Sequence, residues 1–157
     1  MILDVKIVLC GGTMPVKSTG GSAAYDVCAA TDFVIKNGRN KVPLGFKLSF
    51  PPDWEMLIDA RSGFSVKGFE VYHIADTNFE RPLRIDADVI QGKGDSDYRG
   101  EYNVIVKSNE SKPYVIKAGT RIAQITFVPV GSANFDIVED LDETERGDGG
   151  FGHSGTL

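Results

Sequence analysis

The sequence predicts a single all-β domain. Three observations carry this prediction: the chain has 157 residues, short segments alternate apolar and polar side chains, and turn residues separate those segments at short intervals. A chain of this length has enough buried surface for one core. Many short strands without a helical period are typical of a sandwich, a barrel or a jelly roll.

Each expected strand is a short segment rich in β-branched and aromatic residues. In chain order, the expected strands are 4–9, 25–29, 42–50, 55–59, 70–75, 83–90, 102–107, 114–117, 122–130 and 135–139. The turns expected between them are 36–38, 51–53, 92–94, 108–110 and 117–119. We expect only one short helical turn, near 62–67.

The composition excludes several classes of function. A net charge of −5 and a pI near 5.0 argue against a protein that grips long nucleic acid. Two histidines and two cysteines, widely spaced, cannot build the usual zinc sites, and we expect Cys10 and Cys28 to be buried free thiols. No apolar run approaches the roughly 20 residues of a membrane span, and the N-terminus lacks the features of a signal peptide. We therefore expect a cytoplasmic protein, or one of the nucleus or the interior of a virus-infected cell, that is not secreted.

The composition changes near the C-terminus. Residues 146–157 contain five glycines in twelve residues, and such a segment cannot bury enough surface to order itself. We expect residues 1–145 to form the β domain and residues 146–157 to form a flexible tail that closes over a ligand.

The segment 95–101, Asp-Ser-Asp-Tyr-Arg-Gly-Glu, concentrates charge in seven residues. It lies between an expected turn and an expected strand, which places it in a hairpin. A carboxylate there can orient a water as a general base if a phosphate or a carbonyl is held beside it. A solvated, charged turn is the alternative.

Other polar residues lie beside apolar strands. Arg61 and Ser62 follow one such strand, and a guanidinium, a hydroxyl and free N–H groups at a helix start suit an anion, although capping also explains Ser62. Gln124 needs a polar partner if its side of the strand is buried, and Arg121 beside it can form a structural ion pair. Asp26 either serves Mg²⁺ through water or is a paired structural carboxylate.

Five segments in this order, 22–27, 60–63, 95–101, 119–125 and 146–155, resemble the five motifs of the trimeric dUTP diphosphatases (dUTPases). The resemblance implies a jelly-roll subunit of the β-clip type and a homotrimer whose sites are shared between subunits. It also implies Mg²⁺-assisted hydrolysis of dUTP to dUMP and pyrophosphate by water attack on the α-phosphorus. That reaction keeps uracil out of DNA and supplies dUMP for dTMP synthesis.

The resemblance also implies roles for single residues. Asp95 would position and activate the attacking water, and Tyr98 would pack on the deoxyribose and leave no room for a 2′-hydroxyl. The backbone around Gly94 and Asn103 would bind the uracil edge and reject thymine and cytosine. Asp26 would contact the waters of a Mg²⁺ ion that the triphosphate mainly holds.

The remaining implied residues bind the triphosphate or cover the base. The phosphate oxygens would contact Arg61, Ser62, Gly63 and Gln124. The tail residues implied to bind substrate are Arg146, Phe151, Gly152, His153 and Ser154. Among these, Phe151 would stack over uracil, while Arg146, His153 and Ser154 would clamp the terminal phosphates.

The sequence departs from the family pattern in two places near the expected uracil pocket. Residues 92–94 are Gly-Lys-Gly, where the family usually has a glycine followed by an apolar pair. Seventeen residues separate Thr77 from Asp95, where only a few are expected, so we expect an insertion around 78–91. Ala24 and Ala60 replace a usual glycine and a usual proline.

Two other functions remain open at this point. A dCTP deaminase of the same fold would need a glutamate base facing C4 of cytosine and a different hairpin. A dUTP-binding protein with weak catalysis would signal through a partner. The expected insertion keeps this second alternative open, because extra surface loops commonly make contacts rather than chemistry. The segment 95–100 and the tail with its arginine and glycines favour the diphosphatase over the deaminase.

Overall fold

The protein is built from short antiparallel strands, as the alternating pattern predicts. The computed structural model describes residues 2–150 and has 13 strands and one helix in this range. In chain order the elements are β1 Lys6–Leu9, β2 Tyr25–Cys28, β3 Phe33–Ile35, β4 Gly38–Pro43, β5 Phe46–Ser49, β6 Trp54–Asp59, α1 Ser62–Lys67, β7 Phe69–His73, β8 Leu83–Ile85, β9 Ala87–Ile90, β10 Gly92–Gly94, β11 Asn103–Ser108, β12 Tyr114–Ile116 and β13 Arg121–Pro129. The helix occupies the expected range.

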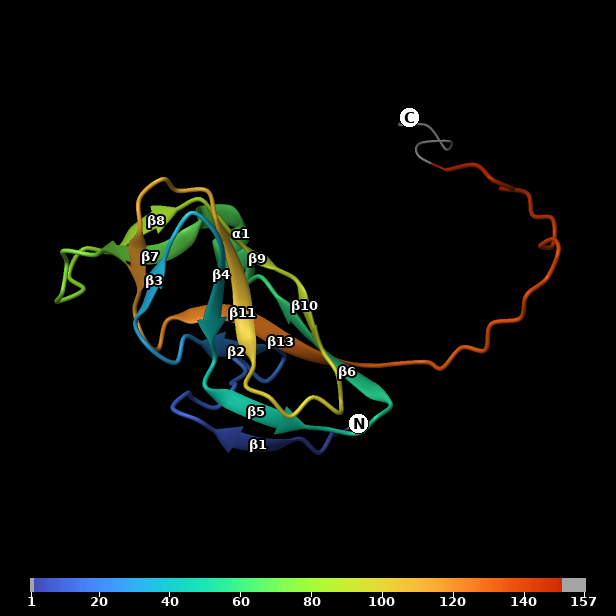
Figure 1. Ribbon diagram of the computed structural model, residues 1–157. Coiled ribbons are helices and arrows are strands. Elements are labelled where there is room, and N and C mark those ends of the chain that lie inside the picture. Colours follow the sequence, from blue (N-terminus) through green and yellow to red (C-terminus); the bar gives the residue numbers. More distant parts are fainter. Residues whose placement is uncertain (1, 151–157) are drawn as a thin grey trace.

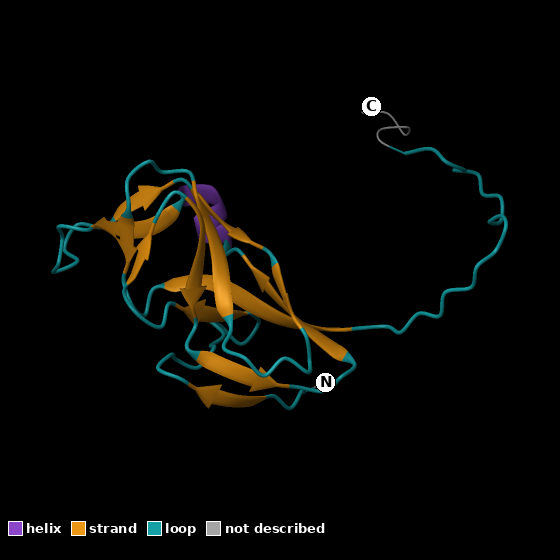
Figure 2. Cartoon of the chain, in the orientation of Figure 1, coloured by secondary structure: helices purple, strands orange, loops and turns teal. Residues whose placement is uncertain are grey.

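The strands form four antiparallel sheets around one core (Figure 1). The strand orders are β1-β5, β10-β6-β13-β2, β4-β11-β9 and β3-β12-β7-β8. Each sheet contributes fully buried side chains, among them Phe46 of β5, Met56 of β6, Val104 of β11 and Ile116 of β12. Strands dominate the whole domain (Figure 2), which confirms the predicted all-β class.

The expected strand 42–50 is interrupted, because the chain leaves one sheet for another. β4 ends at Pro43 and β5 begins at Phe46. Between them Gly45 has a φ of +67°, and a side chain there would collide with the backbone of Gly12. The carbonyl of Gly45 also accepts the backbone N–H groups of Cys10 and Gly12, at 2.7 and 3.0 Å. Alternation of polarity does not reveal such a bend.

Two other strand predictions near residue 90 were wrong in detail. The expected strand 83–90 divides into β8 and β9, which belong to different sheets. Residues 92–94, expected to form a turn, are strand β10, which pairs with β6. Glycines weaken a strand on their own, so this strand exists because a partner strand is available.

Strand β3 was not expected from the sequence. Conversely, the expected strand 135–139 does not form. Within the described residues, no strand follows β13. The side chains of Phe135 and Ile137 are almost fully exposed, at 92% and 102%. The segment 131–150 runs away from the domain (Figure 1) and meets no strand with which it could pair. Strand propensity alone does not make a strand when no partner is present.

The cysteines are free thiols, as expected, but the expected burial was wrong for Cys10, which is exposed; Cys28 is partly buried. Cys10 follows β1, which lies in a two-stranded sheet at the surface. Among residues 2–150, no helix has the length and apolar character needed to cross a membrane.

Candidate active site

Three neighbouring strands bring polar residues to the same end of one sheet. β2, β13 and β6 lie side by side in the sheet β10-β6-β13-β2. Gln124 of β13 is opposite Asp26 of β2 on one side and Asp59 of β6 on the other. The helix α1 follows β6 directly, so Arg61 and Ser62 lie next to this row. Antiparallel register therefore joins residues that are far apart in the sequence.

These residues line a pocket of about 330 Å³, which we name the Asp26 pocket. Its lining residues are Ser18, Ser22, Ala23, Ala24, Asp26, Arg61, Ser62, Gly63 and Gln124. The segments 22–27 and 60–63, which the sequence singled out separately, thus meet at one place together with Gln124.

The carboxylate of Asp26 accepts hydrogen bonds from three side chains at this pocket. Its side chain is largely buried, and its Oδ1 accepts a hydrogen bond from Nε of Arg61 at 2.7 Å. Its Oδ2 accepts from the hydroxyl of Ser18 at 2.9 Å and from Nη1 of Arg121 at 3.1 Å. This is the arrangement expected for a paired carboxylate, one of the two interpretations that the sequence left open. Contact with Mg²⁺ through water stays a prediction.

The surroundings of Asp26 keep it ionised. Burial raises the pKa of its carboxyl, but the hydrogen bond from Ser18 and the guanidinium groups of Arg61 and Arg121 outweigh burial. The net result is a pKa below the ordinary value of 3.8. Asp26 therefore stays negative near neutral pH and holds two arginines at the edge of the pocket.

Ser18 and Arg121 are the residues of this cluster that the sequence did not assign to the site. Arg121 opens β13, and the structural ion pair that the sequence left open for it forms with Asp26. Ser18 carried no signal, because it lies in a loop before β2. That loop is tied back by two backbone hydrogen bonds between Val16 and Asp26, at 2.7 and 3.1 Å. Only the folded loop brings Ser18 to the carboxylate.

The start of α1 offers donors to the pocket. Arg61 is the N-cap residue, but its side chain makes no capping hydrogen bond. Ser62 is the first helical residue, so it is not the cap that the sequence suggested as an alternative. The first N–H groups of a helix have no partner within it, which leaves those of Ser62 and Gly63 suited to an acceptor in the pocket.

The segment 95–101, which we name the Asp95 loop, lies at the other end of β6. In the pairing of β10 with β6, Gly94 lies opposite Met56, which precedes Asp59 by three residues. Beyond Gly94 the chain continues away from Asp59. At about 3.3 Å per residue, Asp95 lies more than about 10 Å from the Asp26 pocket along the strand. Among the described residues, none of the Asp95 loop lines that pocket.

The Asp95 loop closes a hairpin, as expected. β9 pairs with β11, and Ile90 lies opposite Ile105. After β9 the chain leaves this pair of strands, and β10 pairs with β6 instead. Asp95 is exposed, and its carbonyl accepts the N–H of Tyr98 at 3.1 Å. The amide of Asn103, at the start of β11, donates to the carbonyl of Glu101 at 2.9 Å. The loop thus presents a carboxylate and an aromatic ring to solvent.

The tail is described only in part. The Nε of Arg146 donates to the carbonyl of Gly149 at 2.8 Å, on a segment that extends away from the domain. The other predicted tail residues, Phe151, Gly152, His153 and Ser154, lie outside the described residues. Their roles stay predictions.

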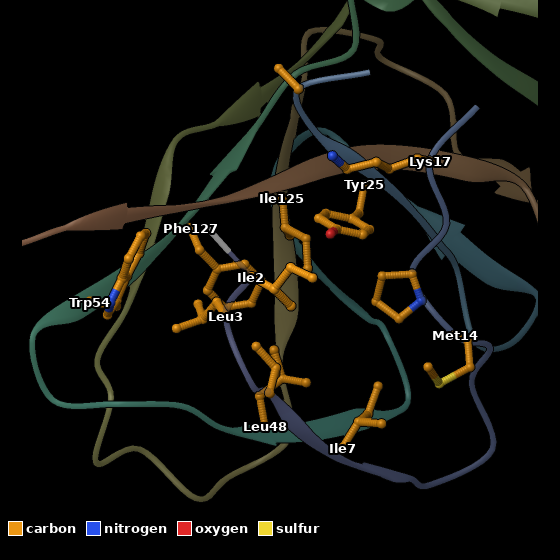
Figure 3. A pocket seen from close by; sticks show the side chains of 13 residues that line it. Ile2, Leu3, Ile7, Met14, Lys17, Tyr25, Leu48, Trp54, Ile125 and Phe127 are labelled. Carbon is orange, nitrogen blue, oxygen red and sulfur yellow. The ribbon is translucent and has the colours of Figure 1, made fainter. Parts of the chain in front are cut away.

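A larger, apolar cavity of about 560 Å³ lies beside β1, β5 and β13 (Figure 3). We name it the apolar groove; its lining residues are Ile2, Leu3, Val5, Ile7, Met14, Pro15, Lys17, Ala23, Tyr25, Leu48, Trp54, Ile125 and Phe127. Figure 3 shows aliphatic and aromatic side chains around it, with Lys17 at its edge. Its polar groups are too few for a phosphorylated substrate, so the Asp26 pocket is the better candidate for chemistry.

No cluster within residues 2–150 could hold a metal ion by three or more histidine, cysteine or carboxylate side chains. The Asp26 pocket offers one carboxylate, whose oxygens already accept hydrogen bonds. This donor set fits a hard cation that keeps several waters and is carried by substrate phosphates, and it does not fit a metal held by protein ligands alone.

Comparison with known proteins agrees with this geometry. The dUTPase family model matches residues 11–87 and 85–155. A deoxyuridine 5′-triphosphate nucleotidohydrolase of Syntrophotalea carbinolica is 35% identical over 156 residues, covering 98% of this chain and 96% of that protein. The protein of the same name from Haemophilus influenzae is 39% identical over 146 residues, covering 90% of this chain and 87% of its own.

Solved structures share the fold. A Staphylococcus bacteriophage 80alpha dUTPase mutant with dUpNHpp superposes with a TM-score of 0.79 at 22% identity, covering 97% of this chain and 98% of that one. A mutant dUTPase of the S. aureus phage phi11, described with a structural Mg(II) ion, has a TM-score of 0.70 at 19% identity, covering 87% and 97%. These matches confirm the predicted jelly-roll class of fold.

The fold and the matched relatives define an all-β nucleotide hydrolase. The chain belongs to the dUTPase family. The resemblance carried by the five sequence segments is thereby confirmed, and the dCTP deaminase alternative is not favoured.

Proposed function

We propose that this chain hydrolyses dUTP to dUMP and pyrophosphate, and that Asp95 positions and activates the water that attacks the α-phosphorus. The observation that carries the proposal is the meeting of segments 22–27 and 60–63 with Gln124 around one pocket. Asp95 suits the role of base because its carboxylate is exposed on a loop tip, with Tyr98 beside it to pack on the sugar.

The Asp26 pocket would hold the phosphates. Ser62 and Gly63 offer a hydroxyl and N–H groups at the start of α1, and Gln124 adds an amide. Arg61 supplies positive charge, and its hydrogen bond to Asp26 fixes the plane of its guanidinium. Mg²⁺ bound to the triphosphate would neutralise its charge. In that case Asp26 would contact the waters of the ion rather than the ion itself.

We also propose that the site is shared between copies of the chain in a homotrimer. The register of β6 and β10 separates Asp95 from the Asp26 pocket within one chain. A phosphate held in the Asp26 pocket therefore needs the Asp95 loop of another copy. Arg146 and residues 151–154 of the tail would then complete the site over the bound nucleotide.

Two surfaces of the chain support self-association. β1 pairs only with β5 among the described strands, so its outer edge is unpaired beside the apolar groove. The segment 135–141 carries exposed Phe135, Ile137 and Leu141 together with acidic residues, and Lys17 lies at the edge of the groove. The expected strand 135–139 would find in a second copy the partner that it lacks among the described strands of its own chain.

One assay tests the proposed reaction. The purified full chain is given Mg²⁺ and dUTP, dCTP, dTTP or UTP in turn, and pyrophosphate and ammonia are measured. We expect pyrophosphate from dUTP and little product from the other nucleotides. Ammonia from dCTP would identify a deaminase, and tight dUTP binding with almost no turnover would identify a dUTP-binding signalling protein. A location in the cell interior stays a prediction.

A further inference from the structure

Tyr102, which follows the Asp95 loop directly, is buried and firmly attached to the domain. Its side chain and backbone together are only 4% exposed. Its N–H donates to the carbonyl of Phe46, and its carbonyl accepts the N–H of Leu44, both at 3.0 Å. The backbone of Tyr102 is therefore fixed to the chain that enters β5. Neither the family motifs nor the proposed function assigns it a role.

The ring of Tyr102 touches the residues that the proposed function uses. Its hydroxyl points to the carbonyl oxygen of Asp95 at 3.5 Å, the long limit of a hydrogen bond. Its ring meets the ring of Tyr98 edge-on, with centroids 5.2 Å apart and planes inclined by 77°. Burial, together with the neighbouring Tyr98 and Asp95, raises the pKa of Tyr102 to about 12, so its hydroxyl stays protonated and can donate.

Gly94 leaves the space that this ring fills. A Cβ atom at Gly94 would lie 2.7 Å from Cε1 of Tyr102 and 3.0 Å from its hydroxyl oxygen. The φ of Gly94 is not in the left-handed region, so space and not backbone conformation requires glycine here. The other close atom, Cε of Met56 at 3.0 Å, ends a flexible side chain that can move. Gly94 and Tyr102 therefore form a complementary pair.

We propose that Tyr102 is a positioning residue for hydrolysis: its ring, seated over Gly94, holds Asp95 and Tyr98 in the geometry that dUTP requires. The family usually places an apolar side chain immediately before the acidic residue. Here that side chain is absent, and Tyr102 fills the space from the other strand of the hairpin. Through Tyr98 the pair also sets selectivity for deoxyribose over ribose. This inference rests on the proposed roles of Asp95 and Tyr98.

A double-mutant cycle on the full chain with Mg²⁺ tests the pair. Tyr102→Leu removes the ring and Gly94→Ala introduces the clash, and kcat and KM are measured for dUTP and UTP. Each single change is expected to lower kcat for dUTP roughly 10- to 100-fold and to lower the preference for dUTP over UTP. The double variant is expected to recover kcat to within about tenfold of wild type, because the new methyl group occupies space that the ring vacated.

Two further variants separate positioning from folding. Tyr102→Phe keeps the ring and is expected to retain most of the turnover, since packing carries more than the long hydrogen bond. Ile116→Ala opens a cavity in β12, in a different sheet, and is expected to lower the melting temperature while kcat is retained. If Ile116→Ala lowers kcat as much as Tyr102→Leu does, the positioning role is overturned.

The proposal is also overturned if Tyr102→Leu keeps wild-type kcat and nucleotide preference, or if the losses of the two single variants simply add. Should Gly94→Ala not fold, the comparison of Tyr102→Leu with Tyr102→Phe decides the question alone. Asp95→Asn is measured beside these variants. Wild-type turnover in Asp95→Asn would refute the proposed role of Asp95, whereas an inactive Asp95→Asn with no rescue in the double variant refutes only the role of Tyr102.

Discussion

The Nε of Arg61 lies 2.7 Å from Oδ1 of Asp26, which joins the start of α1 to the middle of β2 across 35 positions of sequence. Arg121 reaches the same carboxylate from β13. One buried negative charge thus orients two arginines at the pocket that we propose to bind the triphosphate. The pair links the stability of the domain to the geometry of the site.

Removal of the charge of Asp26 should affect both properties. Asp26→Asn removes the negative charge and replaces one of the two acceptor oxygens by an NH2 donor that faces a guanidinium group. We therefore expect a loss of about 1.5–3 kcal/mol in the free energy of unfolding and a higher KM for dUTP. Denaturant unfolding and steady-state kinetics measure the two effects. The control is Glu70→Gln in the exposed pair with Arg84, which should cost less than about 1 kcal/mol. Equal losses in both variants would contradict a special role for Asp26.

The pH dependence of stability follows from the depressed pKa of Asp26. A carboxyl whose pKa is lower in the folded than in the unfolded state stabilises the fold above its ordinary pKa of 3.8. That stabilisation is lost as the pH falls from about 4 through the lower, folded-state pKa. Unfolding measured between pH 3 and pH 7 should therefore show a decline at the acid end, and Asp26→Asn should make this decline shallower. Identical slopes in both proteins would refute the linkage.

Asp95→Asn tests the proposed base. The amide keeps the size of the side chain but cannot take a proton, so kcat for dUTP should fall by about 10²- to 10⁴-fold, with dUTP binding nearly unchanged. The matched control is Asp97→Asn, an exposed carboxylate of the same loop, for which we expect kcat within a few-fold of wild type. A similar loss in both variants would point to loop charge in general rather than to Asp95.

Truncation after Glu145 tests the tail. None of the described residues beyond β13 is buried or belongs to the core, so the shortened chain should fold with an unchanged melting temperature. Its dUTP turnover should fall sharply, because Arg146 and the residues predicted to cover the nucleotide are removed. Unfolding of the truncated chain would instead assign the tail a structural role.

Self-association should depend on the apolar residues of the segment 135–141. In the double variant Phe135→Ser/Ile137→Ser we expect the mass in solution to shift from three copies toward one, measured by light scattering. Ile74→Ser, an exposed apolar residue of the β7–β8 connection, serves as the control and should leave the mass unchanged. An unchanged mass in the double variant would exclude the segment from the interface.

Much of the fold could be predicted because alternation of polarity is a local property. The class, the helix near 62–67 and most strands followed from it. The errors arose where a strand depends on its partner. Gly92–Gly94 is a strand because β6 lies beside it, and 135–139 is not one because no strand in the described range 2–150 lies beside it. At Gly45 a backbone bend divides a segment whose pattern is continuous.

The sequence by itself determined the class of fold and the family, because the order of five short segments along the chain can be recognised without knowing their positions in space. Only the tertiary structure decided how they meet. Register between β2, β13 and β6 joins Asp26, Gln124 and the start of α1, while register between β6 and β10 keeps Asp95 at the far end. Tyr102 carried no signal in the sequence, because the sequence shows only that an apolar side chain is missing at Gly94 and not which residue fills its space.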